Sequence, residues 1–165
     1  MSVLKRVLLM TVVSVVCVGC DQATKSLARS LLPETQVYSF FSDTFRLQLA
    51  YNKGAFLGIG SSLPEHVRQW LLVIGVGLVL AAILSYALFS RSPRTGVVLG
   101  ISLVFAGGVS NLANRIVLEG HVVDFMNIGI GPVRTGIFNV ADIAIMAGFF
   151  MLLLSGFADA KKAPG

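Results

Sequence analysis

Four long apolar stretches, separated by shorter polar segments, dominate the chain. They cover about residues 7–29, 70–89, 97–117 and 138–157. A helix needs roughly 20 mostly apolar residues to cross the hydrocarbon core of a bilayer, so each stretch is long enough to span a membrane. The pattern therefore predicts a mainly α membrane protein with four transmembrane helices, built as a single domain over residues 1–165.

The first stretch has two interpretations. Lys5 and Arg6 precede an apolar run that ends in Gly19-Cys20, which is typical of a secretory signal with a lipoprotein cleavage site. Cys17, however, is unusual three positions before such a cysteine, and three more apolar stretches follow. We therefore interpret residues 7–29 as an uncleaved first span.

The segment after Pro33 has strand character. Residues 37–41 are rich in aromatic and β-branched side chains, and residues 45–51 alternate between apolar and polar. Three glycines (Gly54, Gly58 and Gly60) follow, and they indicate either backbone that approaches a ligand closely or a flexible loop. We expect β structure over about 37–60, a short polar turn at 65–68 after Pro64, and a loop over 119–135.

The charged residues limit the class of protein and predict its orientation in the membrane. Only 13% of residues are charged and 55% are hydrophobic. The net charge of +5 is not gathered into a basic patch with interleaved aromatics, so we expect no nucleic-acid partner. Six basic residues and one acid lie in the terminal segments and the connection around Arg91, and the positive-inside rule then predicts that both termini are cytoplasmic.

With that orientation, polar residues from separate segments meet at the outer face of the membrane. They are Asp21, Asn52, Asn111, Arg115, Asp124, Asn139 and Asp142. An unpaired carboxylate such as Asp142, at the start of an apolar helix, is costly, and Asp124 is the acid that invites pairing with it. Two carboxylates held close share one proton and can hydrolyse a peptide bond. An alternative is that Asn139 and Asp142 form a helix cap, and both interpretations can hold together.

Other interpretations of these polar residues remain open. Asn111 and Arg115 share one helix face and could simply bind helices together. A metal site at His121 and the two acids lacks ligand spacing, so we predict neither a metal nor another cofactor. A small ion-coupled transporter and a non-catalytic membrane scaffold are the alternative functions.

Five motifs then give a specific resemblance over nearly the whole chain. They are Asp21-Gln22-x-x-Lys25, Asn52-x-Gly54-Ala55, Gly107-Gly108 with Asn111 and Arg115, Val122-Val123-Asp124-Phe125, and Phe138-Asn139-x-Ala141-Asp142. In this order and spacing the chain resembles the bacterial lipoprotein signal peptidases, also called signal peptidase II.

The resemblance implies an enzyme of the bacterial cytoplasmic (inner) membrane with four transmembrane helices and a small extracytoplasmic β-sheet. It implies an aspartic endopeptidase that cuts diacylglyceryl-modified prolipoproteins before the lipidated cysteine, and that is inhibited by globomycin-type compounds. We expect a monomer that contacts membrane lipid. The implied catalytic pair is Asp124 and Asp142. The implied supporting residues are Asp21, Lys25, Asn52, Gly54, Asn111, Arg115 and Asn139.

Three positions depart from the pattern of that family. Asn114 stands where Asp usually precedes the arginine, Ser110 replaces a usual Gly, and Phe56 replaces a common Ala. We therefore expect Arg115 to lack a carboxylate partner at position 114 and its charge to be balanced by the anion of the catalytic pair. The alternative is that Asn114 turns towards lipid or a neighbouring helix.

Overall fold

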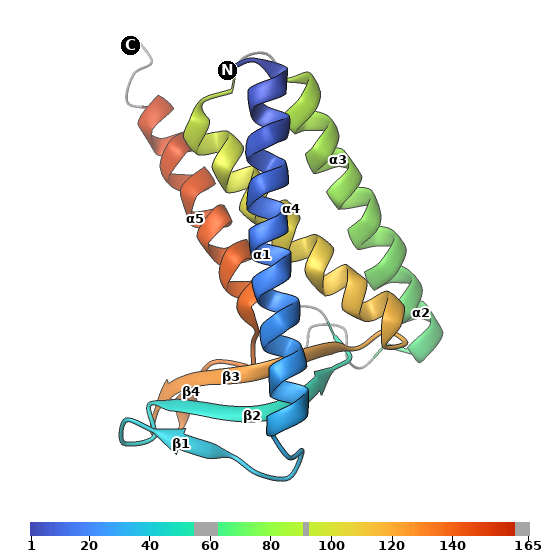
Figure 1. The fold of residues 1–165 in the computed structure, drawn as a ribbon, viewed down its shortest axis with the longest axis vertical. Coiled ribbons are helices and arrows are strands. Elements are labelled where there is room, and N and C mark those ends of the chain that lie inside the picture. The colour runs from blue at the N-terminus through green and yellow to red at the C-terminus, as the bar shows by residue number, and fades with distance from the viewer. Residues whose placement is uncertain (55–62, 91–92, 161–165) are drawn as a thin grey trace.

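The protein is a helical bundle with a sheet at one end (Figure 1). The computed structural model describes residues 1–54, 63–90 and 93–160. The helices are α1 (Val3–Leu31), α2 (Glu65–Trp70), a π-helical turn η2 (Leu71–Gly75), α3 (Val76–Phe89), α4 (Thr95–Val117) and α5 (Val140–Ala160). The strands are β1 (Tyr38–Phe40), β2 (Phe45–Asn52), β3 (Val122–Ile130) and β4 (Val133–Arg134). The predicted fold class, mainly α with a small antiparallel sheet, is confirmed.

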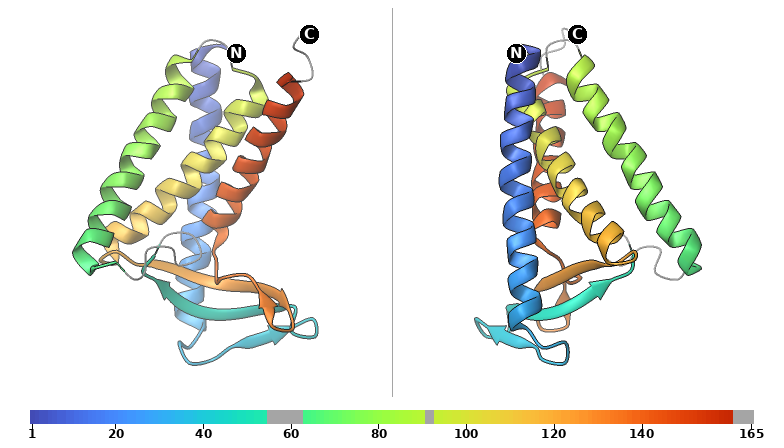
Figure 2. Two further views of the ribbon diagram at one scale, coloured as in Figure 1. Left: turned by 180° about the vertical axis from the view of Figure 1, so that it is seen from behind. Right: turned by 45° about the vertical axis from the view of Figure 1, so that its right-hand side comes forward.

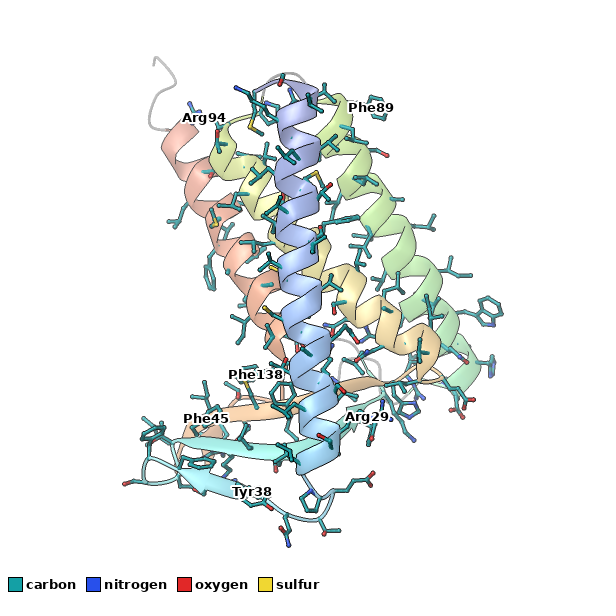
Figure 3. The ribbon with its side chains drawn as sticks, viewed as in Figure 1. Arg29, Tyr38, Phe45, Phe89, Arg94 and Phe138 are labelled. Atoms are coloured by element: carbon teal, nitrogen blue, oxygen red, sulfur yellow. The ribbon has the colours of Figure 1, made fainter. Side chains whose placement is uncertain are left out.

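Three helices in the described part of the chain are long and apolar enough to cross a membrane. They are Val3–Leu31, the continuous helix Glu65–Phe89 and Thr95–Val117. The apolar part of α5, Val140–Gly156, is shorter but lies at the lower end of the range that can span a bilayer. The start of α1 and the end of α5 lie at the end of the bundle away from the sheet (Figure 1). Figure 3 labels Phe89 and Arg94 at that end, and Tyr38 and Phe45 on the sheet.

The helix ends follow from local sequence. Helix α1 stops at Leu31, because Pro33 disfavours helical backbone in the residue before it. At its other end the buried guanidinium of Arg6 donates to the backbone oxygens of Ser90, at 2.7 Å, and Ala87, at 3.4 Å. This cation satisfies carbonyls at the end of α3, where the helix dipole is negative.

Close packing of α4 against α5 depends on glycine. A Cβ atom added to Gly107 would lie 2.4 Å from the carbonyl oxygen of Ala141, and one added to Gly148 would lie 2.5 Å from that of Gly100. Small residues therefore let the two backbones approach closely, as is typical of helix pairs in membranes. Helix α4 also packs against α1 and α3, so it is the central helix of the bundle.

The four strands form one antiparallel sheet in the order β1-β2-β3-β4. Strand β2 pairs with β3 so that Ala50 lies opposite Asp124 and Asn52 opposite Val122. The prediction of a loop over 119–135 was therefore wrong for β3 and β4. The glycines and proline that suggested a loop lie at residues 129–132, near the end of this segment. Its pairing with β2 lies before them, between residues 122 and 128. Residues 55–60 of the predicted β region lie outside the described residues.

The polar turn predicted after Pro64 is also wrong. Residues 65–70 form helix α2, which continues through η2 into α3. Pro64 occupies the N-cap position and Glu65 the first turn, where a negative charge favours the positive end of a helix. Helix α3 diverges from α1 towards the sheet (Figure 2).

Candidate active site

Asp124 enters the site from strand β3. Its side chain is 2% exposed. The side-chain amide of Asn52, on the paired strand β2, donates to Oδ2 at 2.9 Å, and that of Asn139 donates to Oδ1 at 2.6 Å. Both carboxylate oxygens are thus held by amides from two different elements.

Asp142 lies in the first turn of α5 and forms a reciprocal cap with Asn139. The backbone N–H of Asp142 donates to Asn139 Oδ1 at 3.0 Å, and the backbone N–H of Asn139 donates to Asp142 Oδ2 at 3.1 Å. The helix-cap interpretation is therefore confirmed. Asn111, on α4, donates to the remaining oxygen, Oδ1, at 2.9 Å.

The cap also brings the two acids into one site, because Asn139 contacts both. Its Nδ2 donates to Asp124 while its Oδ1 and backbone N–H bind Asp142. Burial, and then the negative charge of Asp142, raise the pKa of Asp124 to about 6. The hydrogen bonds from Asn52 and Asn139 oppose that rise. We refer to Asp124 and Asp142 as the acid pair.

Arg115 and Gly54 lie beside the acid pair. The guanidinium Nη2 of Arg115 donates to the carbonyl oxygen of Gly54 at 2.8 Å, and the backbone N–H of Gly54 donates to Asn52 Oδ1 at 2.9 Å. Among the described residues Arg115 forms no contact ion pair with either acid, so the expected balancing of its charge by the acid pair occurs only as longer-range electrostatic attraction to both carboxyl groups. Its buried Nε has no hydrogen-bond partner in the part of the chain that the structure describes.

A buried ion pair supports the acid pair from helix α1. Lys25 Nζ lies 2.7 Å from Asp21 Oδ2, as their spacing of four residues predicts. Lys25 also donates to Asn111 Oδ1 at 2.7 Å, and Asp21 Oδ1 accepts from the backbone N–H of Ala141 at 2.8 Å. Because the same Asn111 donates to Asp142, a single residue connects this ion pair to the acid pair.

Asn114 turns to the neighbouring helix α1, as the alternative proposed. Its Nδ2 donates to Gln22 Oε1 at 3.1 Å and its Oδ1 accepts from the backbone N–H of Val123 at 3.3 Å. Gln22 also binds Ser110, whose hydroxyl donates to Asp21. Gln22 and Ser110 were not among the predicted site residues, although both stood in or beside the motifs. Phe56 lies outside the described residues.

A cavity of about 410 Å³ opens next to the acid pair. Its polar wall holds Asn52, Asn111, Arg115, Asp124 and Asp142. Its apolar wall comes from η2, α3, α4 and α5, with Leu72, Val76, Val104, Ile145, Met146 and Phe149. A long apolar group therefore fits against the helices while its polar end faces the acids.

Two carboxyl groups held in one site can act as a general acid and a general base. No group of three or more His, Cys, Asp or Glu side chains in the described ranges is placed to hold a metal ion. His121 is instead within 2.9 Å of the carbonyl oxygen of Leu118 through its Nδ1.

Comparison with known proteins places the chain among peptidases. The family model described as signal peptidase (SPase) II matches residues 13–158. The chain is 32% identical over 151 residues to a lipoprotein signal peptidase of Sulfurihydrogenibium sp. (strain YO3AOP1), covering 90% of this chain and 91% of that protein. It is 35% identical over 138 residues to that of Aquifex aeolicus (strain VF5), covering 83% and 78%.

A solved structure has the same fold. It is a bacterial membrane enzyme determined by the in meso method at 2.3 Å resolution, with a TM-score of 0.82 and 25% sequence identity, and the match covers 94% of this chain and 92% of that one. The family model covers most of the chain, the curated relatives exceed 30% identity, and the fold is shared over nearly its whole length. The chain therefore belongs to the signal peptidase II family.

Proposed function

We propose that this protein is an aspartic endopeptidase that removes signal peptides from diacylglyceryl-modified prolipoproteins, cutting before the lipidated cysteine. The observation that carries the proposal is the Asn139 bridge, which holds two carboxylates from different elements beside one apolar cavity. Membership of a peptidase family favours this function over an ion-coupled transporter or a non-catalytic scaffold.

The acid pair supplies both groups that peptide hydrolysis needs. The ionised member takes a proton from a water molecule, whose oxygen attacks the scissile carbonyl carbon, while the protonated member donates to the carbonyl oxygen. The C–N bond then breaks, and a proton passes to the amine of the cysteine that becomes the new amino terminus. The raised pKa of Asp124, caused mainly by burial, favours a pair that shares one proton.

Two cavities bordered by Asp142 support a substrate that is apolar on both sides of the cleaved bond. The cavity described above lies towards α3 and α4. A second cavity, of about 480 Å³, is lined by Phe138, Ile143 and Met146 among others. Asp142 and Met146 border both cavities, so a peptide bond placed at the acid has apolar space in two directions.

The protein is a multi-pass membrane protein, and we place it in the bacterial cytoplasmic membrane as a monomer with both termini in the cytoplasm. The basic excess of the terminal segments supports that orientation, which puts the acid pair at the outer face. The same site is where an inhibitor of the globomycin type is expected to bind.

Cleavage of a purified, diacylglyceryl-modified prolipoprotein tests the proposal. Wild-type protein should convert it to a smaller product on a gel, and Asp124→Asn and Asp142→Asn should each lose activity by more than about tenfold, that is ~1.4 kcal/mol of barrier. The same prolipoprotein without its diacylglyceryl group is the matched control substrate and should remain uncut. Retention of activity by either variant would exclude the acid pair as the catalytic machinery.

A further inference from the structure

A chain of hydrogen bonds joins Asn114 and Ser110, two of the three positions that depart from the family pattern. The backbone N–H of Val123 donates to Asn114 Oδ1 at 3.3 Å, and Asn114 Nδ2 donates to Gln22 Oε1 at 3.1 Å. Gln22 Nε2 donates to the hydroxyl of Ser110 at 2.8 Å and to its carbonyl oxygen at 3.2 Å. The Ser110 hydroxyl then donates to Asp21 Oδ2 at 2.7 Å.

The direction of this chain is fixed at its first member. A backbone N–H can only donate, so the oxygen of Asn114 must face Val123 and its NH₂ group must face Gln22. Gln22 consequently accepts with its oxygen and presents its NH₂ group to Ser110. The one proton of the Ser110 hydroxyl is then left for Asp21, so each bond in this series joins one donor to one acceptor.

The last member of this hydrogen-bond series, Asp21, lies next to the acid pair. Asp21, which is 0% exposed, accepts from Ser110, from Lys25 and from the backbone N–H of Ala141, the residue before Asp142. A carboxylate buried this completely needs its donors, because an unsatisfied charge in an apolar interior is costly. The orientation of Asn114 thus reaches the start of α5 through three side chains, those of Gln22, Ser110 and Asp21.

We propose that Asn114 and Ser110 are paired positioning residues, each compensating for the other, that hold Asp21 and through it the acid pair. This inference rests on the proposed function, since it assigns the role by way of the acid pair. Neither residue touches the acid pair among the described contacts, so their effect on turnover would pass through Gln22 and Asp21.

The usual Asp at position 114 conflicts with Ser110 in this arrangement. A carboxylate has no donor, so Asn114→Asp would set an oxygen against Gln22 Oε1. If the Gln22 amide reversed so that its NH₂ group donated to the new carboxylate, Gln22 Oε1 would face both oxygens of Ser110. Gln22 and Asp21 would then compete for the one hydroxyl proton of Ser110. Replacing Ser110 by Gly removes the hydroxyl whose proton is contested, while Asp21 keeps its donors from Lys25 and from the backbone N–H of Ala141, so the two substitutions should be tolerated together better than Asn114→Asp alone.

A double-mutant cycle on the full-length protein tests the pairing. Turnover of lipidated prolipoprotein is measured for wild type, Asn114→Asp, Ser110→Gly and the double variant, with kcat and KM separated. We expect Asn114→Asp to lower kcat about tenfold with KM within about twofold, and the double variant to regain at least about threefold of that loss. Ser102→Gly is the matched control within α4. Ser102 is equally buried, but among the described residues its hydroxyl bonds only to the carbonyl oxygen of Val98 in its own helix, at 2.6 Å. Combined with Asn114→Asp, it should restore nothing.

Three outcomes overturn the inference. One is a double variant whose loss equals the product of the single losses. The second is equal rescue by Ser102→Gly, which would reduce the effect to general loosening of α4. The third outcome is read from the pH dependence of kcat. If Asn114→Asp acted through the charge of Arg115, the acidic limb of the pH profile would shift, and adding Ser110→Gly would leave that shift unchanged. This result also refutes the pairing. Asp124→Asn, measured in the same assay, reports separately on the proposed function, because activity in that variant contradicts the acid pair whatever the cycle shows.

Discussion

Replacing Asp124 by Asn should make the protein more stable at neutral pH, although it removes the proposed activity. Burial raises the pKa of this carboxyl from 3.8 to about 6, so the folded state resists its ionisation. The folded state binds the proton more tightly than the unfolded state, and stability is therefore lost as the pH rises from about 4 to about 6. Asn has nearly the shape of the neutral acid and cannot ionise, so it escapes that loss. Its NH₂ group faces one of the donating amides of Asn52 and Asn139, which costs about 1 kcal/mol at either pH and leaves most of the gain at neutral pH.

The magnitude follows from the two pKa values. A difference of about two pH units corresponds to roughly 3 kcal/mol once the pH exceeds 6, and to only about 0.6 kcal/mol at pH 4. For a chain of this length, 3 kcal/mol is a rise in Tm of about 6–12 °C. Thermal unfolding of wild type and Asp124→Asn in the same detergent, at pH 4 and at pH 7.5, measures the difference.

Asp43→Asn is a control with the opposite sign. The side chain of Asp43 is 42% exposed, and Arg46 donates to both of its oxygens, at 2.6 and 2.5 Å. The hydrogen bonds from Arg46 and Ser39 hold the pKa of Asp43 well below its usual range. Its ionised form is therefore favoured by folding, and Asp43→Asn should lower Tm at pH 7.5, with the difference fading as the pH falls. If Asp124→Asn gave no gain at pH 7.5, or a gain as large at pH 4, the burial argument would be refuted.

Three further perturbations test the packing, the buried ion pair and the topology. Gly107→Ala should push α5 away from α4, which lowers the free energy of unfolding by about 1–3 kcal/mol and removes much of the activity. Gly77→Ala should be tolerated, because a Cβ added there meets no atom within 4 Å. Thermal unfolding and turnover of both variants check this. Lys25→Met leaves the carboxylate of Asp21 without its buried partner and should destabilise by about 3–5 kcal/mol, so a variant that unfolds at the wild-type temperature would show that the ion pair is dispensable. A reporter enzyme that is active only outside the cytoplasm, fused after Gly165, should stay silent, and a strong signal would reverse the proposed orientation.

Much of the fold was predictable because membrane helices carry a strong sequence signal. Uninterrupted apolar runs located the helical spans to within a few residues, and the alternation from Phe45 to Tyr51 located β2. Strand β3 was missed because its sequence, from Val122 to Ile130, carries buried polar residues where a half-buried strand would alternate. Its pairing with β2 is a long-range contact that no local pattern encodes.

For the site, likewise, the functional residues could be predicted from the sequence more readily than their hydrogen-bond partners. Motifs and the convergence of polar residues at one face singled out the acids and Asn139, and the cap at Asp142 followed from spacing alone. The partner of Arg115 could not be predicted, because Gly54 presents a backbone oxygen, which every residue carries. Gln22 and Ser110 were missed because a single amide or hydroxyl on a helix becomes informative only when its neighbour on another helix is known.

The site is assembled from five elements, α1, β2, α4, β3 and α5, and the last of them supplies Asp142 and the second half of the Asn139 bridge. During synthesis Asp124 leaves the ribosome before Asp142, so a nascent chain holds one acid without the other until the final helix has inserted. Neither the sheet nor the first three spans can hydrolyse a peptide bond by the proposed mechanism. Under the proposed mechanism, the order of the chain therefore delays a complete acid pair until α5 has joined the other elements.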